Sequence, residues 1–418
     1  MARINNTARW RPVGAALSLL LLASTAARAA LSVLAETPDW RELDVYQHTL
    51  TAAEFRARLP LYSNDGALAR YLTFSDRGVE IFADQDKTRK LWELRWAAAP
   101  SAVPDFPPGP AADRDRPLAG LNICLDPGHI GGDWADMEER HFRIRGGPWV
   151  DEAALNFITC QWIEQGLRAA GAEVCWTRQL GVPATPRRPA DFTSPAITLM
   201  WRQDANKAAR QSPGNLRKLL QWYQELVFYR IAEIQARAAT VRELRPDLTL
   251  CIHYNALGWS KRGPRLYSGV NRIVIFTHGS YLASELALDD MKFDLFRKLL
   301  EHAGGTERRV ADAIAEQVVA VWQYPPERYR AGLAGVAPAG RTPYVWSRNL
   351  LANRLYPGPV VFVEGPFMDD ALTYRRIIAG DYAGEREIAG RNYRSIYREY
   401  ADIVVRGVLA AYQKTQHH

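Results

Sequence analysis

The chain has 418 residues, of which 47% are hydrophobic and 24% are charged, and its formal net charge is +7. This balance supplies enough apolar side chains for a sizeable core and excludes a largely disordered chain. No basic cluster with interleaved aromatic residues occurs in the sequence, so nucleic acid is not an expected partner. The length predicts one large domain accompanied by a smaller one.

The first 29 residues have the pattern of an export signal. Basic residues precede an apolar stretch at 13–23, and the small-x-small sequence Ala27-Arg28-Ala29 follows it. The apolar stretch is short for a bilayer span, and we expect no integral membrane segment after cleavage. Loss of the four arginines in this segment reduces the formal net charge from +7 to +3. We therefore expect export to the periplasm or the extracellular space, where a mild positive charge suits an anionic polymer such as cell-wall material.

Residues 30–97 are predicted to form a small α+β module, whose role the sequence does not reveal. Thr51 and Glu54 have the spacing of a capping box at the start of a helix. Residues 71–74 and 78–82 alternate between apolar and polar side chains, like two strands joined by a turn.

A proline-rich stretch separates this module from the rest of the chain. Residues 98–118 contain six prolines among Ala, Asp and Arg, which is the composition of an extended linker. The large domain is therefore expected at 119–414. Two stretches interrupt its regular pattern, a polar insertion at 179–215 and a charged amphipathic insertion at 278–304.

The large domain alternates predicted strands and predicted helices. The apolar runs that predict strands lie at 121–125, 172–177, 248–252, 272–276 and 360–363. The amphipathic stretches that predict helices lie at 152–170, 216–244, 310–322 and 393–412. This alternation predicts an α/β fold, in which helices cover both faces of a mostly parallel sheet.

The four cysteines do not have the spacing of a metal site. Cys124, Cys175 and Cys251 lie in predicted strands and Cys160 lies in a predicted helix, where buried free thiols are common. An exported protein can also form disulfides, so the sequence leaves the disulfide state open.

Four polar side chains stand at the ends of predicted elements. His129 follows the first strand of the large domain in the sequence Asp-Pro-Gly-His, and His253 and Glu364 each follow a later strand. Glu152 opens the first helix. The carboxyl ends of parallel strands meet at one edge of a sheet, where α/β folds build their sites. We therefore expect these four side chains to lie close together.

Two imidazoles and one carboxylate are a ligand set of catalytic zinc, which keeps a fourth position open. His129, Glu152 and His253 can supply that set. Glu364 then remains as a general base that takes a proton from water and passes it to a leaving amine. Each residue alone has an ordinary alternative, such as a turn histidine, a glutamate favoured by the helix dipole, or a solvated strand end.

Residues 119–412 resemble the zinc-dependent N-acetylmuramoyl-L-alanine amidases, often called amidase type 3. The motifs that carry the resemblance are Asp126-Pro127-Gly128-His129, Glu152 with Asn156, Ile252-His253-Tyr254-Asn255, and Val363-Glu364-Gly365-Pro366-Phe367. The resemblance implies hydrolysis of the amide between N-acetylmuramic acid and L-alanine in peptidoglycan. It also implies that His129, Glu152 and His253 bind Zn²⁺ and that Glu364 is the catalytic base and acid.

The resemblance suggests further candidates around the site. Arg178, Asn255 and Arg348 are candidates for substrate contacts, with a structural role as the alternative for Arg178. The insertion at 278–304 occupies the place where some Gram-negative cell-division amidases carry a helix that covers the zinc. The hypothesis for this chain is that Glu285 or a neighbouring acid caps the metal until an activator protein moves the helix. The alternative is an ordinary packed insertion.

The sequence departs from the family pattern after His129. Ile130 adds one residue before the Gly-Gly pair, and the following loop, 133–149, is rich in Arg and Glu. This loop also holds His141 and the pair Glu138-Glu139, which is an alternative source of the carboxylate ligand, although the helix-start position favours Glu152. Two other functions therefore stay open, an exported zinc hydrolase acting on another amide and a catalytically silent cell-wall-binding protein. The presence of Glu364 argues against the silent protein, because a binding protein has no need of a base.

Overall fold

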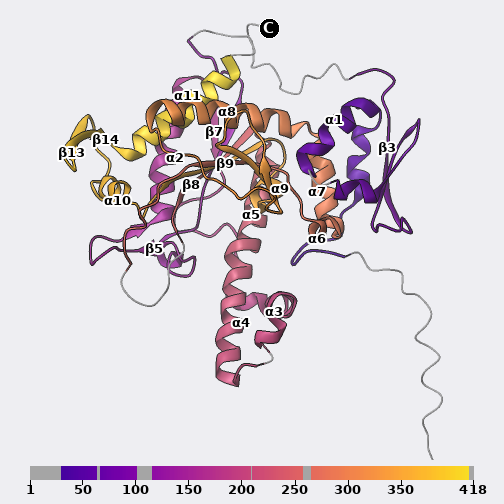
Figure 1. The fold of residues 1–418 in the computed structure, drawn as a ribbon, viewed down its shortest axis with the longest axis horizontal. Coiled ribbons are helices and arrows are strands. Elements are labelled where there is room, and N and C mark those ends of the chain that lie inside the picture. Colours follow the sequence, from indigo (N-terminus) through magenta and orange to yellow (C-terminus); the bar gives the residue numbers. More distant parts are fainter. Residues whose placement is uncertain (1–29, 64–65, 101–114, 209, 258–264, 414–418) are drawn as a thin grey trace, which may run out of the picture.

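The computed structural model shows a small N-terminal module, a large α/β body and a helical arm that extends from the body (Figure 1). The residues that it describes are 30–63, 66–100, 115–208, 210–257 and 265–413. The predicted export signal and most of the predicted linker lie outside these residues. No helix among the described residues combines the length and the apolar character that a membrane crossing requires.

The N-terminal module is a three-stranded antiparallel sheet packed with one helix. Its elements are β1 (Leu72–Phe74), β2 (Gly78–Phe82), β3 (Lys90–Arg95) and α1 (Ala52–Tyr62). Helix α1 begins with the predicted capping box, in which the Glu54 carboxylate accepts from the Thr51 amide at 2.8 Å and the Thr51 hydroxyl accepts from the Glu54 amide at 3.2 Å. The two predicted strands are present, and β3 is a third that the sequence did not predict.

The insertion at 278–304 completes the core of this module. It forms α6 (Ala283–Leu286) and α7 (Asp289–Leu300). The ring of Phe296 stacks on Phe55 with centroids 6.2 Å apart, and Phe293 meets Trp40 edge-on at 5.5 Å. The apolar stripe of this insertion is therefore buried by residues that lie far before it in the printed sequence.

The body is built on a seven-stranded sheet with the order β10-β11-β9-β12-β8-β4-β7. The strands are β4 (Asn122–Pro127), β7 (Glu173–Trp176), β8 (Leu248–Asn255), β9 (Val274–Thr277), β10 (Val336–Pro338), β11 (Val345–Arg348) and β12 (Val360–Phe367). Strands β12, β8, β4 and β7 are parallel to one another, whereas β9 is antiparallel to β12 and β11 is parallel to β9. The fold is α/β with a mostly parallel sheet, as predicted.

Helices cover one face of this sheet, and we call it the closed face. The helices are α2 (Glu152–Ala169), α8 (Ala303–Val321) and α11 (Ile396–Gln413). Val363 of β12 and Ile252 of β8 point into this layer and are 0% exposed. Gly407 lets α11 approach α8 closely, because a Cβ there would lie 2.6 Å from the Cα of Ile314.

Helices cover the opposite face only in part, and we call it the open face. Helices α5 (Glu233–Leu244) and α9 (Leu351–Leu355) pack against its beginning. Their buried contacts include Cys251 of β8 and Val360 of β12. Because side chains alternate along a strand, His253 and Glu364 follow on this same face, further toward the carboxyl ends.

The insertion at 179–215 is largely helical, where the sequence predicted a polar interruption. It contains α3 (Thr193–Ala208) and the start of α4 (Pro213–Val227), which together form the arm. Buried Met200 and Tyr223 lie in the core between these helices. Helix α4 continues through a π-helical turn, Phe228–Ala232, into α5, so the long helix predicted from 216 begins three residues earlier, after the cap Ser212.

Several short elements carry too little periodicity to be predicted. They are β5 (His141–Phe142), β6 (Val150–Asp151), α10 (Ala371–Ile378), β13 (Glu385–Ile388) and β14 (Arg391–Arg394). The last helix begins at Ile396, because Tyr393 belongs to the β13–β14 hairpin. All four cysteines are free thiols in the structure.

Candidate metal centre

The turn after β4 presents His129 to the open face. The backbone of His129 has φ +62°, a left-handed conformation that histidine adopts more readily than most residues. The Arg178 guanidinium lies beneath the turn and donates to the carbonyl oxygens of Pro127 at 2.8 Å and Gly128 at 2.9 Å. Arg178 is only 7% exposed. This placement favours the structural alternative that the sequence left open for Arg178.

Gly128 permits the close approach of the next ligand strand. A Cβ at this position would lie 2.1 Å from Cε1 of His253, which is inside van der Waals contact. The third position of the Asp-Pro-Gly-His sequence therefore requires glycine, because any larger side chain there would collide with His253 of β8.

The structure brings His129, Glu152 and His253 together. Oε1 of Glu152 lies 3.2 Å from Nε2 of His129 and 3.1 Å from Nδ1 of His253. One ligand atom from each of the three residues lies within 4.8 Å of the other two. Glu152 is the first residue of α2, and Asn156, one turn later, donates to the Gly128 carbonyl at 3.1 Å. This bond ties the helix to the turn.

The three side chains fit a zinc ion by their chemistry. They offer two imidazole nitrogens and one carboxylate oxygen, which is the donor set of several catalytic zinc sites. Both imidazoles contact the same oxygen of Glu152. A cation bound between the three side chains would take the place of these two contacts. The other oxygen, Oε2, is buried without a hydrogen bond. Arg140 Nε lies 2.9 Å from it, an ion pair without hydrogen-bond geometry.

Glu138 contacts the opposite nitrogen of His129. Its carboxylate accepts from the amides of Ile130 at 2.9 Å and Gly131 at 3.0 Å, and it lies 3.5 Å from Nδ1 of His129. Carboxylates in this position fix the orientation of metal-binding imidazoles. The additional residue Ile130 thus supplies one of the amides that hold Glu138. The alternative that Glu138 itself is a ligand is not favoured, because Glu152 occupies the position between the two imidazoles.

Glu364 lies next to His253 on the neighbouring strand. The parallel register of β12 and β8 pairs these two residues, and the His253 ring stacks on Phe362 with centroids 4.4 Å apart. The Tyr400 hydroxyl of α11 donates to the His253 carbonyl at 3.0 Å and also contacts the Val363 carbonyl at 3.2 Å. The ends of the two strands are therefore fixed from the closed face.

The electrostatics of the site shift several pKa values. Burial lowers the pKa of His129, but the facing carboxylates of Glu152 and Glu138 outweigh burial and raise it to about 9. Burial raises the pKa of Glu152, and the two imidazoles more than reverse this, so its pKa falls below the usual range. Burial raises the pKa of Glu364 to about 8, and the charge of Glu152 adds to the effect. Strongly shifted groups in one cluster are typical of functional sites.

The remaining candidates lie at different distances from this cluster. Asn255 ends β8, and its side chain accepts from the Ala256 amide at 2.8 Å. Arg348 ends β11 and is exposed. The structure does not bring Glu285 to the site, since its carboxylate accepts from the Leu282 amide at 2.7 Å and caps α6. The apolar stripe of the insertion is buried by the N-terminal module, which favours the alternative of an ordinary packed insertion.

Sequence reasoning missed two arginines that support the site. Arg140 pairs with Glu152, and Arg237 of α5 lies beneath the turn after β4. Arg237 is 2% exposed and pairs with Asp126 at 3.1 Å and with Glu233 at 3.0 Å. A signal for Arg237 existed, because the buried Asp126 of the Asp-Pro-Gly-His sequence requires a cation. The sequence could not show which of the many arginines supplies it.

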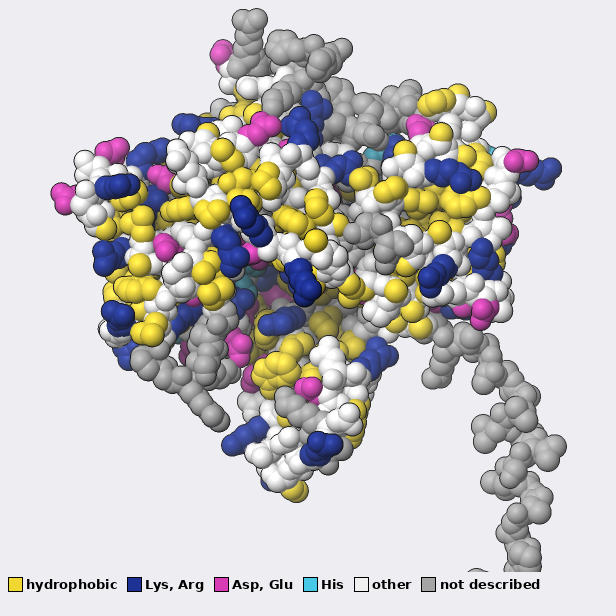
Figure 2. Space-filling model, in the orientation of Figure 1, with side chains coloured by type: hydrophobic (Ala, Val, Ile, Leu, Met, Phe, Trp, Pro, Cys, Tyr) yellow, Lys and Arg dark blue, Asp and Glu magenta, His cyan; other side chains and the backbone are white. Residues whose placement is uncertain are grey.

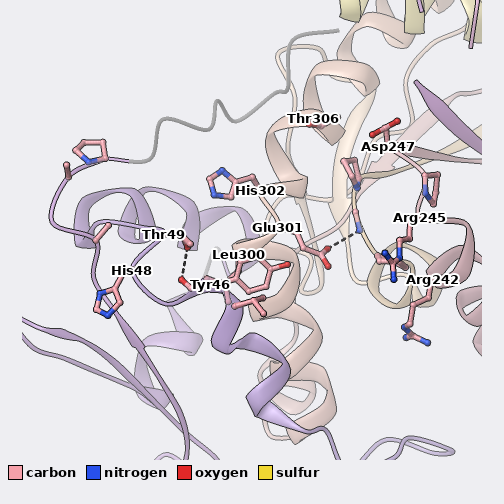
Figure 3. A pocket seen from close by; sticks show the side chains of 18 residues that line it. Tyr46, His48, Thr49, Arg242, Arg245, Asp247, Leu300, Glu301, His302 and Thr306 are labelled. Atoms are coloured by element: carbon pink, nitrogen blue, oxygen red, sulfur yellow. Dashed lines mark hydrogen bonds between the residues drawn. The ribbon is translucent and has the colours of Figure 1, made fainter. Parts of the chain in front are cut away.

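A separate cavity of about 1020 Å³ lies between the N-terminal module and the body (Figure 3). The residues that line it include Tyr46, Arg242, Arg245, Asp247, Glu301 and His302. Asp247 and Pro359 place it at the beginnings of β8 and β12, the edge of the sheet away from His253 and Glu364. None of the predicted site residues lines this cavity. Among the described residues, His129, Glu152 and His253 form the one group with the arrangement of a metal site.

Solved structures of N-acetylmuramoyl-L-alanine amidases are similar to this chain. Ami1 from Mycobacterium smegmatis is 16% identical, with a TM-score of 0.38 over 71% of this chain and 98% of the other. AmiC2 of Nostoc punctiforme is 13% identical, with a TM-score of 0.38 over 71% of this chain and 99% of the other. The CwlD amidase from Clostridioides difficile, solved in complex with the GerS lipoprotein, is 13% identical, with a TM-score of 0.36 over 71% of this chain and 98% of the other. No family model and no curated protein matches the sequence.

Proposed function

We propose that this chain is a zinc-dependent N-acetylmuramoyl-L-alanine amidase, which hydrolyses the amide between N-acetylmuramic acid and L-alanine in peptidoglycan. The observation that carries the proposal is the convergence of His129, Glu152 and His253, with Glu364 on the adjacent strand. Zinc bound by the three ligands supplies Lewis acidity to a carbonyl oxygen and to water. The proposal includes export by the first 29 residues, because the proposed substrate lies outside the cytoplasmic membrane.

Glu364 is the proposed group for proton transfer. Its raised pKa, about 8, means that it exchanges a proton within the neutral range. Arg140 and Arg348 favour its carboxylate form, as does any cation held by the three ligands. The carboxylate takes a proton from the attacking water. It then donates this proton to the amine of L-alanine as the carbon–nitrogen bond breaks, leaving a lactyl carboxylate and a free peptide amine.

The surrounding residues hold the reacting groups in place. Glu138 fixes the ring of His129 through Nδ1 and leaves Nε2 directed at the site. Tyr400 fixes the backbone at the ends of β8 and β12, so His253 and Glu364 keep their relative position. Such rigid support is required because small displacements of reacting groups cost large factors in rate.

Incubation of the purified chain with purified peptidoglycan tests the proposal. We expect stem peptides that begin with L-alanine, identified by mass spectrometry, no release after treatment with a chelator, and recovery on addition of zinc. Glu364→Gln is the matched variant, and it is expected to bind zinc without releasing peptides. Products cut at another amide would favour the other exported zinc hydrolase. Zinc binding without hydrolysis in the unaltered chain would favour the silent wall-binding protein.

A further inference from the structure

A row of aromatic side chains lies on the open face and extends away from Glu364 across neighbouring strands. The registers place Phe362 of β12 opposite Phe276 of β9, and Phe276 opposite Trp346 of β11. Tyr329, from the segment before β10, contacts both Phe276 at 6.3 Å and Trp346 at 5.0 Å between ring centroids. We call these four residues the aromatic shelf.

The aromatic shelf starts at the candidate metal centre. The His253 ring stacks on Phe362, and Phe362 meets Phe276 edge-on at 6.4 Å. Phe276 is buried, whereas Phe362, Tyr329 and Trp346 are each only partly buried. Helices α5 and α9 pack further back on this face. Figure 2 shows a hollow between the body and the arm, with histidine and acidic side chains at its base.

Arg348 adds a positive charge to the aromatic shelf. It is two residues from Trp346 on β11 and therefore shares its face of the sheet. Its guanidinium lies 5.8 Å from the Phe276 ring centroid. Among the described residues, no carboxylate forms an ion pair with Arg348, whereas the nearby Arg272 pairs with Glu327 at 2.8 Å. Its charge reaches the candidate base, since it favours the ionised form of Glu364.

The placement of Arg348 relative to Glu364 suits a peptide substrate. Strands β12 and β11 are separated only by β9, so their axes are about 10 Å apart. The registers pair Glu364 with Val274 and Ser347 with Thr277, so the backbone of Arg348 lies about four residues nearer the start of β12 than Glu364 does. Its side chain extends over Phe276, which pairs with Phe362. A peptide whose amine leaves at Glu364 and that lies over these two rings therefore runs toward Arg348, and its first two residues span about 7 Å.

We propose that the aromatic shelf binds the peptide part of the substrate and that Arg348 recognises a carboxylate on the residue after L-alanine. The proposal rests on the proposed function, because that function places the leaving amine at Glu364. Guanidinium groups recognise carboxylates through paired, charge-assisted hydrogen bonds. The partly buried rings supply apolar contact for the remainder of the peptide.

Binding of product-like peptides tests this recognition. The probes are two synthetic peptides that begin with L-alanine and differ only in a carboxylate or a carboxamide on the second residue. We expect calorimetry to show that the carboxylate peptide binds about tenfold more tightly than the carboxamide peptide. This is the contribution expected from one hydrogen-bonded charged pair. Arg348→Gln should remove this preference without weakening the carboxamide peptide, and Arg348→Lys should restore part of it. Arg391→Gln, an exposed arginine on β14, should keep the full preference.

The results of these measurements separate the two proposals. The probe peptides contain no muramic acid amide, so their binding does not depend on hydrolysis. Equal binding of both peptides, or a preference that survives Arg348→Gln, would overturn the recognition by Arg348. A retained preference in a chain that releases nothing from peptidoglycan would refute the proposed hydrolysis alone.

With cleavable substrates, Arg348→Gln is expected to raise KM for the carboxylate form. If Arg348→Gln changed the pH profile of hydrolysis but kept the preference for the carboxylate peptide, the role of Arg348 would be to adjust the pKa of Glu364. That result would overturn the proposal.

Discussion

Adjacent residues of β12 face two different environments. Val363 points into the closed face, where α8 and α11 leave it 0% exposed. Glu364 points to the open face, where it remains partly accessible beside His253. On the closed face Val363 is held by apolar packing, whereas the helices that pack on the open face, α5 and α9, contact β8 and β12 further back than His253 and Glu364. The comparison teaches that one strand can serve stability with one set of side chains and chemistry with the alternate set.

The largest expected difference between the two faces comes from neighbouring substitutions on β12. Glu364→Gln keeps the shape of the side chain but cannot accept the proton, so peptide release should fall by about 10²–10⁴-fold with little change in unfolding free energy. Val363→Ala should lower the unfolding free energy by about 2 kcal/mol and leave activity per folded molecule intact. Kinetics of peptide release and denaturant titrations measure both. A Val363→Ala variant that keeps its stability but loses activity would contradict the assignment of stability to the closed face and chemistry to the open face.

Two glycines provide a second test, because each permits a close contact on one face. Alanine at Gly128 would place its Cβ 2.1 Å from the His253 ring, and alanine at Gly407 would place it 2.6 Å from the backbone of Ile314. We expect Gly128→Ala to weaken zinc binding by about 100-fold, since the ring has to leave Glu152. Gly407→Ala should destabilise the fold by about 1–3 kcal/mol and leave zinc affinity unchanged. Chelator competition and denaturant midpoints distinguish these results, and a loss of zinc affinity in Gly407→Ala would contradict them.

The closed face was the more predictable of the two. The apolar stripe of α2 and the apolar runs of β4, β8 and β12 predict buried elements, because the spacing of apolar residues indicates which side of an element is buried. The residues that converge were also predictable, since His129, His253 and Glu364 all follow such runs. Topology then brings the ends of parallel strands together.

The sequence could not show which partner buries an apolar stripe. Phe293 and Phe296 indicate a buried helix at 278–304, but the same pattern suits a helix over the metal site and a helix under the N-terminal module. Their aromatic partners, Trp40 and Phe55, lie far away along the chain. Supporting residues such as Arg140 lie in a loop without periodicity, so only the folded contacts identify them. The sequence therefore could not decide between a capping role for Glu285 and an ordinary packed insertion.

A third prediction concerns the carboxylate behind His129. Glu138→Gln keeps its volume but removes the charge that faces Nδ1 of His129. Loss of such a supporting partner typically costs 10–100-fold in metal affinity, and we expect about tenfold or more here. Asp133→Asn, an exposed acid in the same loop, is the matched control and should leave the affinity unchanged. Equal affinities of the Glu138 variant and the unaltered chain would show that the turn alone orients His129.

The smallest expected effect distinguishes two histidines that differ in their surroundings. The pKa of His129 is raised by its carboxylates, whereas burial lowers the pKa of His278 well below its usual range, with Lys298 and Arg354 adding to the shift. His278 is 3% exposed, and its Nε2 lies 2.7 Å from the Tyr281 hydroxyl. Its backbone amide donates to Glu307 at 3.0 Å. Folding therefore keeps this imidazole neutral.

The sign of the resulting pH dependence follows from proton uptake. Below about pH 6.5 the unfolded chain protonates His278 and the folded chain does not, so the stability contributed by this residue falls as the pH falls. The loss approaches about 1.4 kcal/mol per pH unit and is absent above about pH 7.5. Denaturant midpoints at pH 7.5, 6.5 and 5.5 measure it, and the difference between the unaltered chain and His278→Gln cancels the other titrating groups. The variant should lose less stability on acidification, since glutamine has no proton to gain. Identical pH slopes for the two proteins would mean that His278 takes up a proton in the folded chain as readily as in the unfolded chain, so that its burial does not keep it neutral.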